Sequence, residues 1–555
     1  MMVAGQQGRI ELATLLTGLE YKGRGGVAGR LVASVTSDSR QVGPGAVFVA
    51  VRGEAVDGHV FIDEAISKGC VALVVEAGHP LVRARKAKPA AEVCWIQVAD
   101  SRSALGQLVA AFFGHPAAGL RLIGVTGTNG KTTTSYLLES MIKESGGRPG
   151  VIGTVNYRFG ATVQPAELTT PGPVRLHELL RRMADDGVTH VIMEVSSHAL
   201  SQDRLHGLRF DVALFTNLSR DHLDFHGDMA TYFASKKKLF THYLKEDGTA
   251  VVINWPPGEI DGGAQPDEIN WGRQLIEELR GSELRSAAQA GVGRLQGERR
   301  RTGPRHILEC GVREGDVCLG PVHFDNHGIT AAIKTPVGSW ELRSRLVGEF
   351  NLKNLLGGVG VGVALGLDRQ AACRGLARVE AVPGRLERVA SPAAGAIFVD
   401  YAHTPDAMEN VLRTLATLEH RRLIVVFGCG GDRDVGKRPI MGQVAGRLAD
   451  VVLLTSDNPR SEDPGRILGA IERGLTDTPL RRGRAEAILA RPGTRGYDVV
   501  ESRRAAIEIA VRFLAAGDIL LISGKGHENY QITRTGQHFF DDRVEVRRQA
   551  CQVRW

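Results

Sequence analysis

The stretch GVTGTNGKTTT, residues 124–134, decides the fold class of this 555-residue chain. It overlaps the end of an apolar run, LRLIGV (residues 120–125), and leads into a helix-like segment that begins at Lys131. A glycine-rich turn between a strand and a helix is the context that a phosphate-binding loop requires. The stretch therefore predicts a nucleotide-binding α/β sheet.

The residues of this loop suit a nucleoside triphosphate. Glycines let backbone N–H groups turn toward phosphate oxygens, and the N-terminus of the next helix adds its dipole. Lys131 would reach the β- and γ-phosphates, and the hydroxyl of Thr132 would hold Mg²⁺. Val125 stands where the G-x4-G-K-T motif needs glycine, so the loop is the shorter G-x-x-G-K-T variant. A chance glycine-rich turn is the alternative, and the lysine followed by three threonines argues against it.

Apolar strands and helix-length amphipathic segments alternate along the rest of the chain, which predicts an α/β protein with largely parallel sheets. We divide the chain into three blocks, at residues 1–117, 118–382 and 383–555. The first block contains expected strands at 46–51 and 71–76, and the third reads as a doubly wound domain. The expected strands of the third block are 396–400, 422–427, 451–455 and 518–523, and its expected helices are 405–415, 440–448, 467–475 and 505–515.

The composition is that of a soluble globular protein, with 43% hydrophobic and 24% charged residues. It excludes a disordered, collagen-like or coiled-coil chain. No run approaches the ~20 apolar residues of a membrane helix, and the N-terminus lacks the apolar core of a signal peptide. We therefore expect a cytoplasmic protein without a membrane span.

The 69 Lys and Arg outnumber the 62 Asp and Glu, a surplus that suits anionic small molecules or nucleic acid. The Arg-dense segment 294–305 has no interleaved aromatic residues and reads as a solvated loop, so we expect no nucleic-acid partner. The Pro- and Gly-rich stretch 256–266 reads as a surface loop. Seven scattered cysteines without a C-x-x-C pair argue against a disulfide framework or a zinc site.

Further polar side chains follow expected strands. Glu194 ends an apolar run, where a carboxylate beside a phosphate loop would hold Mg²⁺. FTNLSRDHLDFHG supplies Asp221, His222 and Asp224, and Lys236 follows in YFASKKKLF. Each feature alone is more typical of an exposed loop, a satisfied histidine or a solvated helix face. Four such features in chain order behind a phosphate loop favour a metal-dependent site.

Together these motifs resemble the Mur ligases of peptidoglycan synthesis. The resemblance covers about residues 36–544 and rests on GTNGKTT, EVSSHAL, FTNLSRDHLDFHG, Y-x3-K-x2-L-F, GEFNLKN, VPGRLE, DYAHTPDA, GCGGDRDVGKRP, DNPR and GKGHE. It implies a UDP-sugar domain over 1–117, a central ATP domain over 118–382 and a Rossmann-like amino-acid domain over 383–555. It also implies a monomer.

The reaction that the resemblance implies is the ATP-dependent joining of meso-2,6-diaminopimelate to UDP-N-acetylmuramoyl-L-alanyl-D-glutamate through an acyl phosphate. Two Mg²⁺ ions are the implied cofactors, and ATP is the co-substrate. The implied metal ligands are Thr132, Glu194, His222 and Lys236, and the implied catalytic residues are Lys131, His222 and Lys236. Lys236 matches a lysine that family members carry as a carbamate, because a bare ammonium cannot bind a cation.

The resemblance also implies three groups of binding residues. For ATP they are Gly127, Thr128, Asn129, Gly130, Lys131, Thr132, Thr133, Asn351, Arg385, Asp400 and His403. For the UDP-sugar peptide they are Ser37, Ser39, Glu54, Ala55, Val56, Thr169, Thr170, Ser196, Gln202 and Arg204. For diaminopimelate they are Arg433, Asp457, Asn458, Pro459, Arg460, Gly524 and Glu528. A core-capping role is the alternative for the two threonines.

The amino-acid substrate depends on DNPR, residues 457–460, which follows an expected strand, where open α/β sheets bind ligands. Arg460 offers a planar guanidinium for a distal carboxylate, and Glu528 would pair with an ammonium. Diaminopimelate, with two amines and two carboxylates, satisfies both. On its own, DNPR is also typical of an ordinary type I turn.

The chain departs from the family pattern after Asn254, where members usually show one or two aspartates. Here Trp255, Pro256 and Pro257 follow. The departure lies outside the implied chemistry.

Three alternatives stay open. The first is the same ligase acting on L-lysine or another diamino acid. The second is a ligase like folylpolyglutamate synthetase, which shares the phosphate loop and metal residues but leaves DNPR and TSDSR (residues 36–40) unexplained. The third is a nucleotide-binding partner protein without ligase activity, which would not need Lys236, Arg460 and Glu528.

Overall fold

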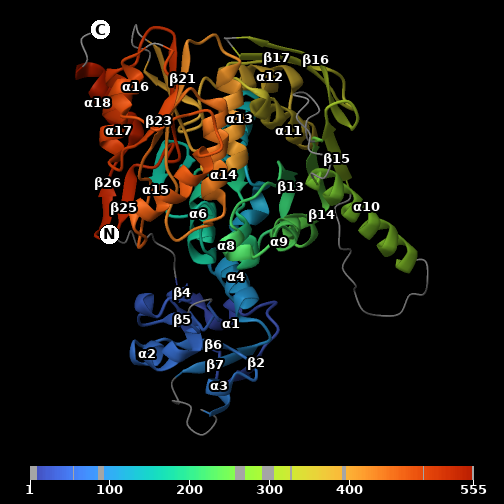
Figure 1. The fold of residues 1–555 in the computed structure, drawn as a ribbon. Coiled ribbons are helices and arrows are strands. Elements are labelled where there is room, and N and C mark those ends of the chain that lie inside the picture. Colours follow the sequence, from blue (N-terminus) through green and yellow to red (C-terminus); the bar gives the residue numbers. More distant parts are fainter. Residues whose placement is uncertain are drawn as a thin grey trace. The chain divides into compact units, whose positions relative to one another are not determined.

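The computed structural model describes residues 9–53, 56–84, 93–256, 269–290, 306–325, 328–390, 395–491 and 493–552 (Figure 1). The chain forms two compact units. The first contains Met1–Gly124, Gly147–Asp211 and Lys238–Lys245, and the second contains Val125–Gly146, Val212–Lys237 and Glu246–Trp555.

The N-terminal part of the first unit is built on a five-stranded sheet of order β2-β7-β6-β5-β4. Its strands are β2 (Lys22–Arg24), β4 (Ser34–Thr36), β5 (Ala46–Val49), β6 (Ala72–Glu76) and β7 (Cys94–Val98), all parallel except β2 at the edge. Around it lie α1 (Leu12–Leu15), α2 (Ile62–Ser67), α3 (Pro80–Ala84), α4 (Ser101–Phe112), the 3-10 turns η1 (Ser39–Gln41), η2 (Gly58–Phe61) and η3 (Pro116–Gly119), and the strand pair β1 (Ile10–Glu11) and β3 (Leu31–Val32). Successive strand residues belong to different buried clusters, as Val47 and Phe48 do, because side chains alternate between the faces of a sheet.

The remainder of the first unit contains strands in the order β11-β10-β9-β12. They are β9 (Pro149–Ile152), β10 (Asn156–Phe159), β11 (Thr162–Pro165) and β12 (His190–Glu194), with helices α6 (Pro173–Asp185) and α7 (Ser197–Ser201). β12 is parallel to β9, whereas β9, β10 and β11 are joined antiparallel. Strands β8 (Arg121–Thr126) and β13 (Phe210–Phe215) each begin in the first unit and end in the second.

In the second unit, the strands after β13 follow the order β14-β15-β16-β17-β18. Their bounds are β14 (Leu244–Asn254), β15 (His306–Gly311), β16 (Val317–Asp325), β17 (Gly328–Lys334) and β18 (Trp340–Ser344). The helices are α5 (Lys131–Glu144), α8 (Leu223–His226), α9 (Met229–Thr241), α10 (Trp271–Ala290), α11 (Glu349–Leu365) and α12 (Arg369–Arg378). The end of α9 and the start of β14, within Lys238–Lys245, belong to the first unit. β14, β15 and β16 are parallel, and β16, β17 and β18 are antiparallel. Pro256 is in an irregular segment, and the rest of the expected 256–266 loop and all of 294–305 lie outside the described residues.

Helix α11 contains four glycines, which ordinarily weaken a helix. An added Cβ at Gly360 would lie 2.6 Å from Cys310 Sγ, and one at Gly362 would lie 2.8 Å from Met141 Cε. The glycines therefore allow α11 to pack closely against β15 and α5, and this packing places the first turn of α11 beside the phosphate loop.

The C-terminal sheet has the order β19-β20-β24-β21-β22-β23. Its strands are β19 (Glu387–Ala390), β20 (Gly395–Asp400), β21 (Arg422–Phe427), β22 (Val451–Leu454), β23 (Gly496–Val499) and β24 (Asp518–Ser523), parallel except β19. Its helices are α13 (Pro405–Ala416), α14 (Lys437–Leu448), α15 (Pro464–Glu472), η4 (Arg473–Leu475), α16 (Ala485–Leu489), α17 (Arg503–Arg512) and α18 (Asp542–Gln552), and a hairpin joins β25 (Tyr530–Thr533) to β26 (Gly536–Phe539).

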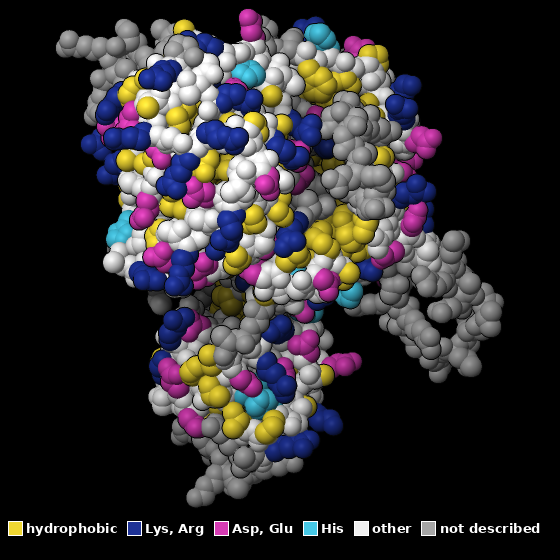
Figure 2. Space-filling view, viewed as in Figure 1, with side chains coloured by type: hydrophobic (Ala, Val, Ile, Leu, Met, Phe, Trp, Pro, Cys, Tyr) yellow, Lys and Arg dark blue, Asp and Glu magenta, His cyan; other side chains and the backbone are white. Residues whose placement is uncertain are grey.

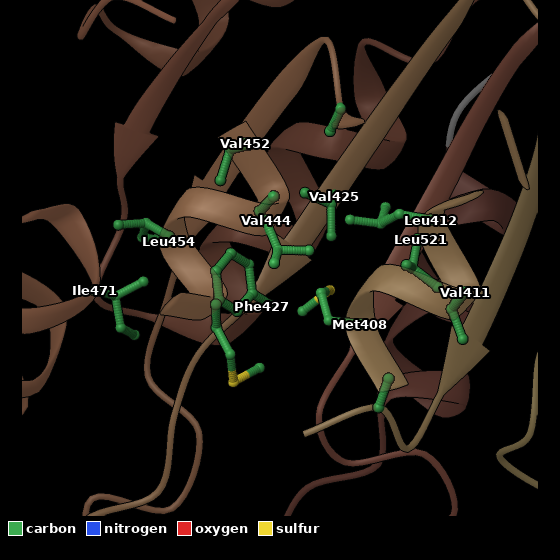
Figure 3. Close-up of a cluster of buried hydrophobic side chains, with 14 of the residues drawn as sticks. Met408, Val411, Leu412, Val425, Phe427, Val444, Val452, Leu454, Ile471 and Leu521 are labelled. Atoms are coloured by element: carbon green, nitrogen blue, oxygen red, sulfur yellow. The ribbon is translucent and has the colours of Figure 1, made fainter. Parts of the chain in front are cut away.

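Helices cover both faces of this C-terminal sheet. Figure 3 shows one face, where Phe427 and Leu521 from the strands meet Met408 from α13 and Val444 from α14. The opposite cluster joins the alternate strand residues to helices α16, α17 and α18. This is the doubly wound arrangement that the sequence predicts, and the predicted α/β fold class is confirmed.

No described helix is both long and apolar enough to cross a membrane. On the face shown in Figure 2, Lys and Arg side chains are dispersed among Asp and Glu side chains. The surplus of positive charge is therefore not gathered into one stripe on that face.

Candidate active site

The phosphate loop joins β8 to α5, as the sequence predicts, and two of its glycines have positive φ angles. φ is 150° at Gly127 and 86° at Gly130. An added Cβ would collide with Thr216 Oγ1 at the first position and with the Asn354 side chain at the second. Only glycine fits this backbone without strain.

The segment that follows β13 holds the loop in place. The backbone N–H of Thr128 donates to the Asn217 carbonyl at 3.1 Å, and that of Asn129 donates to Asn217 Oδ1 at 2.9 Å. The Thr216 hydroxyl donates to the Asn129 carbonyl at 2.6 Å. The loop is therefore a preformed cradle whose shape does not depend on a bound phosphate.

The side chain of Lys131 folds back onto the phosphate loop. Its Nζ donates to the carbonyl oxygens of Gly127 at 2.7 Å and Thr128 at 2.8 Å. These carbonyls hold the ammonium at the mouth of the loop, where phosphate oxygens can replace them.

Lys236 is fully buried beneath the same loop. Its Nζ donates to the Gly127 carbonyl at 2.8 Å and lies 4.5 Å from the centre of the Tyr232 ring. Burial, together with the charge of Lys131, holds the pKa of Lys236 well below its usual range, although Asp221 opposes the shift. The amine is therefore biased toward its neutral, nucleophilic form.

Asp221 lies between two histidines. Its carboxylate is 3.3 Å from Nε2 of His222 and 3.7 Å from Nε2 of His403. Burial alone would raise the pKa of Asp221, but the hydrogen bond with His403 and the neighbouring His222 and Lys437 hold it well below its usual range. Asp221 therefore stays ionised, and its carboxylate lies close to both histidines.

Arg385 and Asp400 come from the C-terminal block, and Arg385 contacts the start of α5 directly after the phosphate loop. Nη2 of Arg385 donates to Thr132 Oγ1 at 3.2 Å, and its guanidinium lies 4.4 Å from the centre of the Tyr401 ring. Asp400 accepts the backbone N–H of Ala402 at 2.7 Å. Burial raises the pKa of Asp400, and the charge of Arg385 opposes that shift.

A cavity of about 320 Å³ lies beside the phosphate loop. Asn129 and Gly130 of the loop line it together with Arg385 and Asp400. Asn129 Nδ2 also donates to Asp406 Oδ2 at 2.9 Å, which joins the loop to the start of α13.

The two asparagines of GEFNLKN have different positions. Asn354 lines the cavity and contacts the phosphate loop at Gly130. Asn351 lies one turn earlier in α11, and its Oδ1 accepts from Asn354 Nδ2 at 3.2 Å. Asn351, predicted to bind ATP, therefore supports the asparagine that faces the cavity.

The predicted carboxylate of the first unit, Glu194, ends β12 and is buried. It accepts the hydroxyl of Thr154 at 2.8 Å and the backbone N–H of Thr154 at 3.2 Å. Thr154 also shares a 3.1 Å hydrogen bond with Thr169. The orientation of Glu194 is thus fixed by a threonine that the sequence motifs do not single out.

The predicted sugar-peptide residues form two groups in the first unit. Arg204 donates to the Thr170 carbonyl at 3.0 Å and to Gln202 Oε1 at 2.9 Å. Thr170 in turn donates to the Glu194 carbonyl at 2.8 Å and to Ser196 Oγ at 3.4 Å. This network brings together five residues that the sequence singled out. The contacts of Thr170 are also those expected if its role is structural, which is the alternative given above for the two threonines.

The other predicted sugar-peptide residues belong to the N-terminal sheet. Ser37 is exposed after β4, Ser39 is buried in η1, and Val56 is exposed. Glu54 and Ala55 lie outside the described residues.

The predicted amino-acid residues follow β21, β22 and β24. Lys525, buried in GKGHE, donates to Asn458 Oδ1 at 3.0 Å and to the Tyr530 carbonyl at 2.6 Å, and lies 3.3 Å from Asp457. Gly524 has a φ of 116°, and an added Cβ there would lie 2.7 Å from Asp457 Oδ2. Through these contacts with Asn458 and Asp457, Lys525 holds the DNPR loop in place.

Glu528 lies at the centre of this region. It accepts from Asn458 Nδ2 at 3.0 Å and from the Tyr401 hydroxyl at 3.4 Å. Burial raises the pKa of Glu528, and the nearby Asp457 adds to the shift. An ammonium group bound beside Glu528 would lower the pKa of this carboxyl group and so oppose both effects.

Arg460 has a φ of 52°, a left-handed conformation. Its backbone N–H donates to the Ile532 carbonyl at 3.1 Å, and its Nη1 donates to the Gly431 carbonyl at 2.8 Å. Arg433 is exposed and donates to the Asp432 carbonyl at 3.0 Å. Arg460 is therefore held between the loop that follows β21 and strand β25.

Sequence reasoning missed several of these side chains as site residues. Asn354, Lys525 and Asp406 stand inside the quoted motifs GEFNLKN, GKGHE and DYAHTPDA, so each motif carried a signal. Thr154 has no such local signal, because its role depends on Glu194 and Thr169, which lie elsewhere in the sequence.

Comparison with known proteins agrees with this geometry. The Mur ligase middle domain matches residues 125–259, the Mur ligase glutamate ligase domain matches 384–526, and the catalytic domain of the Mur ligase family matches 31–113. A Geobacter metallireducens protein named UDP-N-acetylmuramoyl-L-alanyl-D-glutamate–2,6-diaminopimelate ligase is 44% identical over 514 residues, which cover 92% of each chain. The chain belongs to the Mur ligase family.

Solved structures place the whole chain among the Mur ligases as well. A structure of a UDP-N-acetylmuramoyl-L-alanyl-D-glutamate–2,6-diaminopimelate ligase is 31% identical, with a TM-score of 0.60, and covers 94% of this chain and 95% of that one. A folylpolyglutamate synthase from Mycobacterium tuberculosis, solved with ADP and AMPPCP, is 19% identical with a TM-score of 0.55 and covers 76% of this chain and 91% of that one. The second likeness shows a shared fold alone.

Proposed function

We propose that this Mur ligase joins meso-2,6-diaminopimelate to UDP-N-acetylmuramoyl-L-alanyl-D-glutamate, using ATP, in cytoplasmic peptidoglycan precursor synthesis. The observation that carries the proposal is the convergence, in the second unit, of a phosphate loop, the buried Lys236, and Arg385 and His403 from the C-terminal block. The name of the 44% identical relative supports the choice of substrates.

The first chemical step transfers the γ-phosphoryl group of ATP to the free carboxylate of the muramoyl dipeptide. Lys131 and Arg385 supply two positive charges at the loop, the first from Nζ and the second beside Thr132 Oγ1. Charge neutralisation and alignment are the main contributions that a protein makes to phosphoryl transfer. Both residues are expected to bind the transferring group more strongly as its charge develops.

In the second step, the lone pair of the incoming amine attacks the acyl carbon and forms the C–N bond. The bond between that carbon and the phosphate oxygen then breaks, phosphate leaves with the electron pair, and the nitrogen loses a proton to give the amide. The protein contributes mainly by positioning the amine. Glu528 and Asn458 would hold the amino acid by its charged groups at the ends of β24 and β22.

Mg²⁺ would neutralise phosphate charge and orient the nucleotide. In the second unit, the candidate ligands are the Thr132 hydroxyl, His222 and Lys236, and this set fits once Lys236 carries an anionic oxygen. The neutral amine that burial favours at Lys236 is the form that adds CO₂: a C–N bond forms and the nitrogen loses a proton. Glu194, oriented by Thr154 in the first unit, supplies the predicted carboxylate, and we propose two ions.

Arg460 would recognise the distal carboxylate of diaminopimelate. Its Nη1 is fixed on the Gly431 carbonyl, and a guanidinium bonds a carboxylate through two parallel hydrogen bonds. L-Lysine lacks this carboxylate, so it would leave the half-buried guanidinium without that partner.

The decisive experiment is phosphate release by the full chain with ATP, Mg²⁺, the muramoyl dipeptide and diaminopimelate, with each substrate omitted in turn. Release that requires all three substrates is the expected result. Release that proceeds without the muramoyl dipeptide would contradict the proposed acceptor, and release that requires a folate in its place would favour the folylpolyglutamate alternative.

A further inference from the structure

The cavity that contains the phosphate loop has a wall that the implied chemistry does not use. Trp255 and Pro256, where the chain departs from the family pattern, directly follow β14 and line the cavity together with Asn129 and Gly130. Trp255 is half-buried. A large aromatic side chain thus faces the same space as the phosphate cradle.

Two groups of residues in the lining of this cavity, beside other charged and apolar side chains, correspond to the parts of a nucleotide. One group consists of the phosphate-loop residues with Arg385 and Asp400. The other consists of apolar side chains around the end of β14 and the start of α10, namely Ile253, Trp255, Pro256, Ile269 and Trp271. A nucleotide divides in the same way, into charged phosphates and an uncharged, flat base.

The two tryptophans have different neighbours. Trp271 is stacked at a tilt on Phe233, with ring centroids 5.0 Å apart, so it is committed to the packing of α10 on α9. Gly272 allows this close approach, because an added Cβ there would collide with the Ile253 carbonyl. Trp271 therefore has a structural role in the wall of the cavity.

Trp255 is held from α11 instead. The Nζ of Lys353 lies 4.9 Å from the centre of the Trp255 ring, and Glu349 holds that ammonium at 3.1 Å. A cation over one face of an indole is an attractive contact that orients the ring. The opposite face of the indole is then the one that a second flat group can cover.

We propose that Trp255 is the stacking platform for the purine base of ATP and that Lys353 and Glu349 position it. The inference rests on the proposed function, since it assumes that nucleotide phosphates occupy the loop. Stacking on an aromatic side chain tolerates any base because every base has a π-face, whereas the phosphates gain nothing from it. The platform therefore contributes to affinity for nucleotides and not for inorganic phosphates.

The first test measures binding by calorimetric titration of the full chain with Mg²⁺-ADP and with Mg²⁺-pyrophosphate, which lacks the base. Trp255→Ala should raise the Kd for ADP about 5- to 100-fold and leave that for pyrophosphate nearly unchanged. Trp255→Phe, which keeps an aromatic face, should lose far less. Trp271→Phe is the matched control for a second indole in the same wall.

The second test reads the indole directly. Of the five tryptophans, only Trp255 is expected to be covered by the base, so ADP should quench the intrinsic fluorescence of the wild type and of Trp271→Phe. The quenching should disappear in Trp255→Phe, a variant that also serves if Trp255→Ala does not fold.

Three outcomes would overturn the platform. They are unchanged ADP affinity in Trp255→Ala, an equal loss for ADP and pyrophosphate, and persistence of the quenching in Trp255→Phe. If the wild type binds both pyrophosphate and ADP and any of these outcomes is found, only the role proposed for Trp255 is wrong. If the wild type binds neither ligand, the nucleotide site of the proposed function fails as well.

Discussion

Three consecutive lysines of α9 show how far a residue type determines its role. Lys236 is buried against the Gly127 carbonyl, Lys237 pairs with Glu278 at 2.6 Å, and Lys238 pairs with Asp203 at 3.3 Å. Successive residues of a helix point about 100° apart, so only one of the three faces the loop. The spacing from Tyr232 predicted that Lys236 is this residue. The lowered pKa of Lys236, however, depends on burial, which the sequence does not show.

Lys236→Ala should lower kcat on the order of a hundredfold or more, because it removes a ligand from the phosphoryl-transfer site. A short-chain carboxylate such as acetate should restore part of the activity by supplying the missing anionic oxygen. Steady-state phosphate release with and without acetate measures both effects. Lys237→Ala, one residue further and half-exposed, is the control and should keep near wild-type activity. A Lys236→Ala enzyme with full activity would remove this residue from the mechanism.

Arg460 sets the amino-acid substrate in this account. Arg460→Ala should lower kcat/KM for diaminopimelate on the order of a hundredfold, since a hydrogen-bonded charge pair contributes about 1.5–3 kcal/mol. It should change kcat/KM for L-lysine much less, because lysine has no distal carboxylate. Specificity constants for both amino acids with wild type and variant provide the measurement. An unchanged ratio of the two constants would show that Arg460 does not read the carboxylate.

At the scale of elements, strands β21 and β24 are joined by a buried ion pair. Arg422 and Asp518 share two hydrogen bonds of 3.1 and 2.6 Å, and both side chains are almost fully buried. Asp518→Asn would leave the guanidinium charge buried, so it should cost about 3–5 kcal/mol of stability. Urea denaturation measures the loss. Glu277→Gln, which breaks the exposed Arg273–Glu277 pair, should cost less than about 1 kcal/mol, and equal losses would contradict the role of burial.

Helix α6 contains a buried histidine that makes the first unit sensitive to acid. Burial lowers the pKa of His177 to about 4 from an ordinary 6.5, although a backbone contact at His206 opposes the shift. Between these two pH values the unfolded chain binds a proton that the folded chain does not, so stability falls as pH falls from about 6.5 to about 4. At 1.36 kcal/mol per pKa unit the loss approaches about 3 kcal/mol.

His177→Leu should remove this part of the pH dependence of stability. At pH 8 the histidine ring is neutral in both the folded and the unfolded chain, so its titration does not contribute to stability there. Thermal unfolding at pH 5 and pH 8 makes the comparison. If the difference between the two pH values is the same in wild type and variant, His177 does not carry the effect.

The elements themselves were predictable where their patterns are local. Four C-terminal strands and four helices were predicted from apolar runs, and β20, β21 and β24 lie within one residue of their expected bounds. Strand β23 and helices α16 and α18 were not predicted. The antiparallel strands β16, β17 and β18 were not expected. In β16 the register shifts between Leu319 and Val322, so Gly320 and Pro321 interrupt the alternation that would have marked a strand.

At the scale of the whole molecule, the contacts that complete the nucleotide site join distant parts of the sequence. Arg385 meets Thr132 across 253 residues, and His403 meets Asp221 across a shorter but still long stretch of sequence. Motifs identify such residues one at a time, whereas only the fold shows which of them meet. The division into three domains, at residues 117 and 382, stays a prediction.

The measurement that tests the central claim most directly is a competition between amino acids. The full chain is given ATP, Mg²⁺ and UDP-N-acetylmuramoyl-L-alanyl-D-glutamate with equal concentrations of meso-diaminopimelate and L-lysine, and the products are weighed by mass spectrometry. Discrimination by a polar site of this kind predicts a diaminopimelate product in excess on the order of a thousandfold. A lysine product in comparable amount, or hydrolysis of ATP without any amide product, would contradict the account.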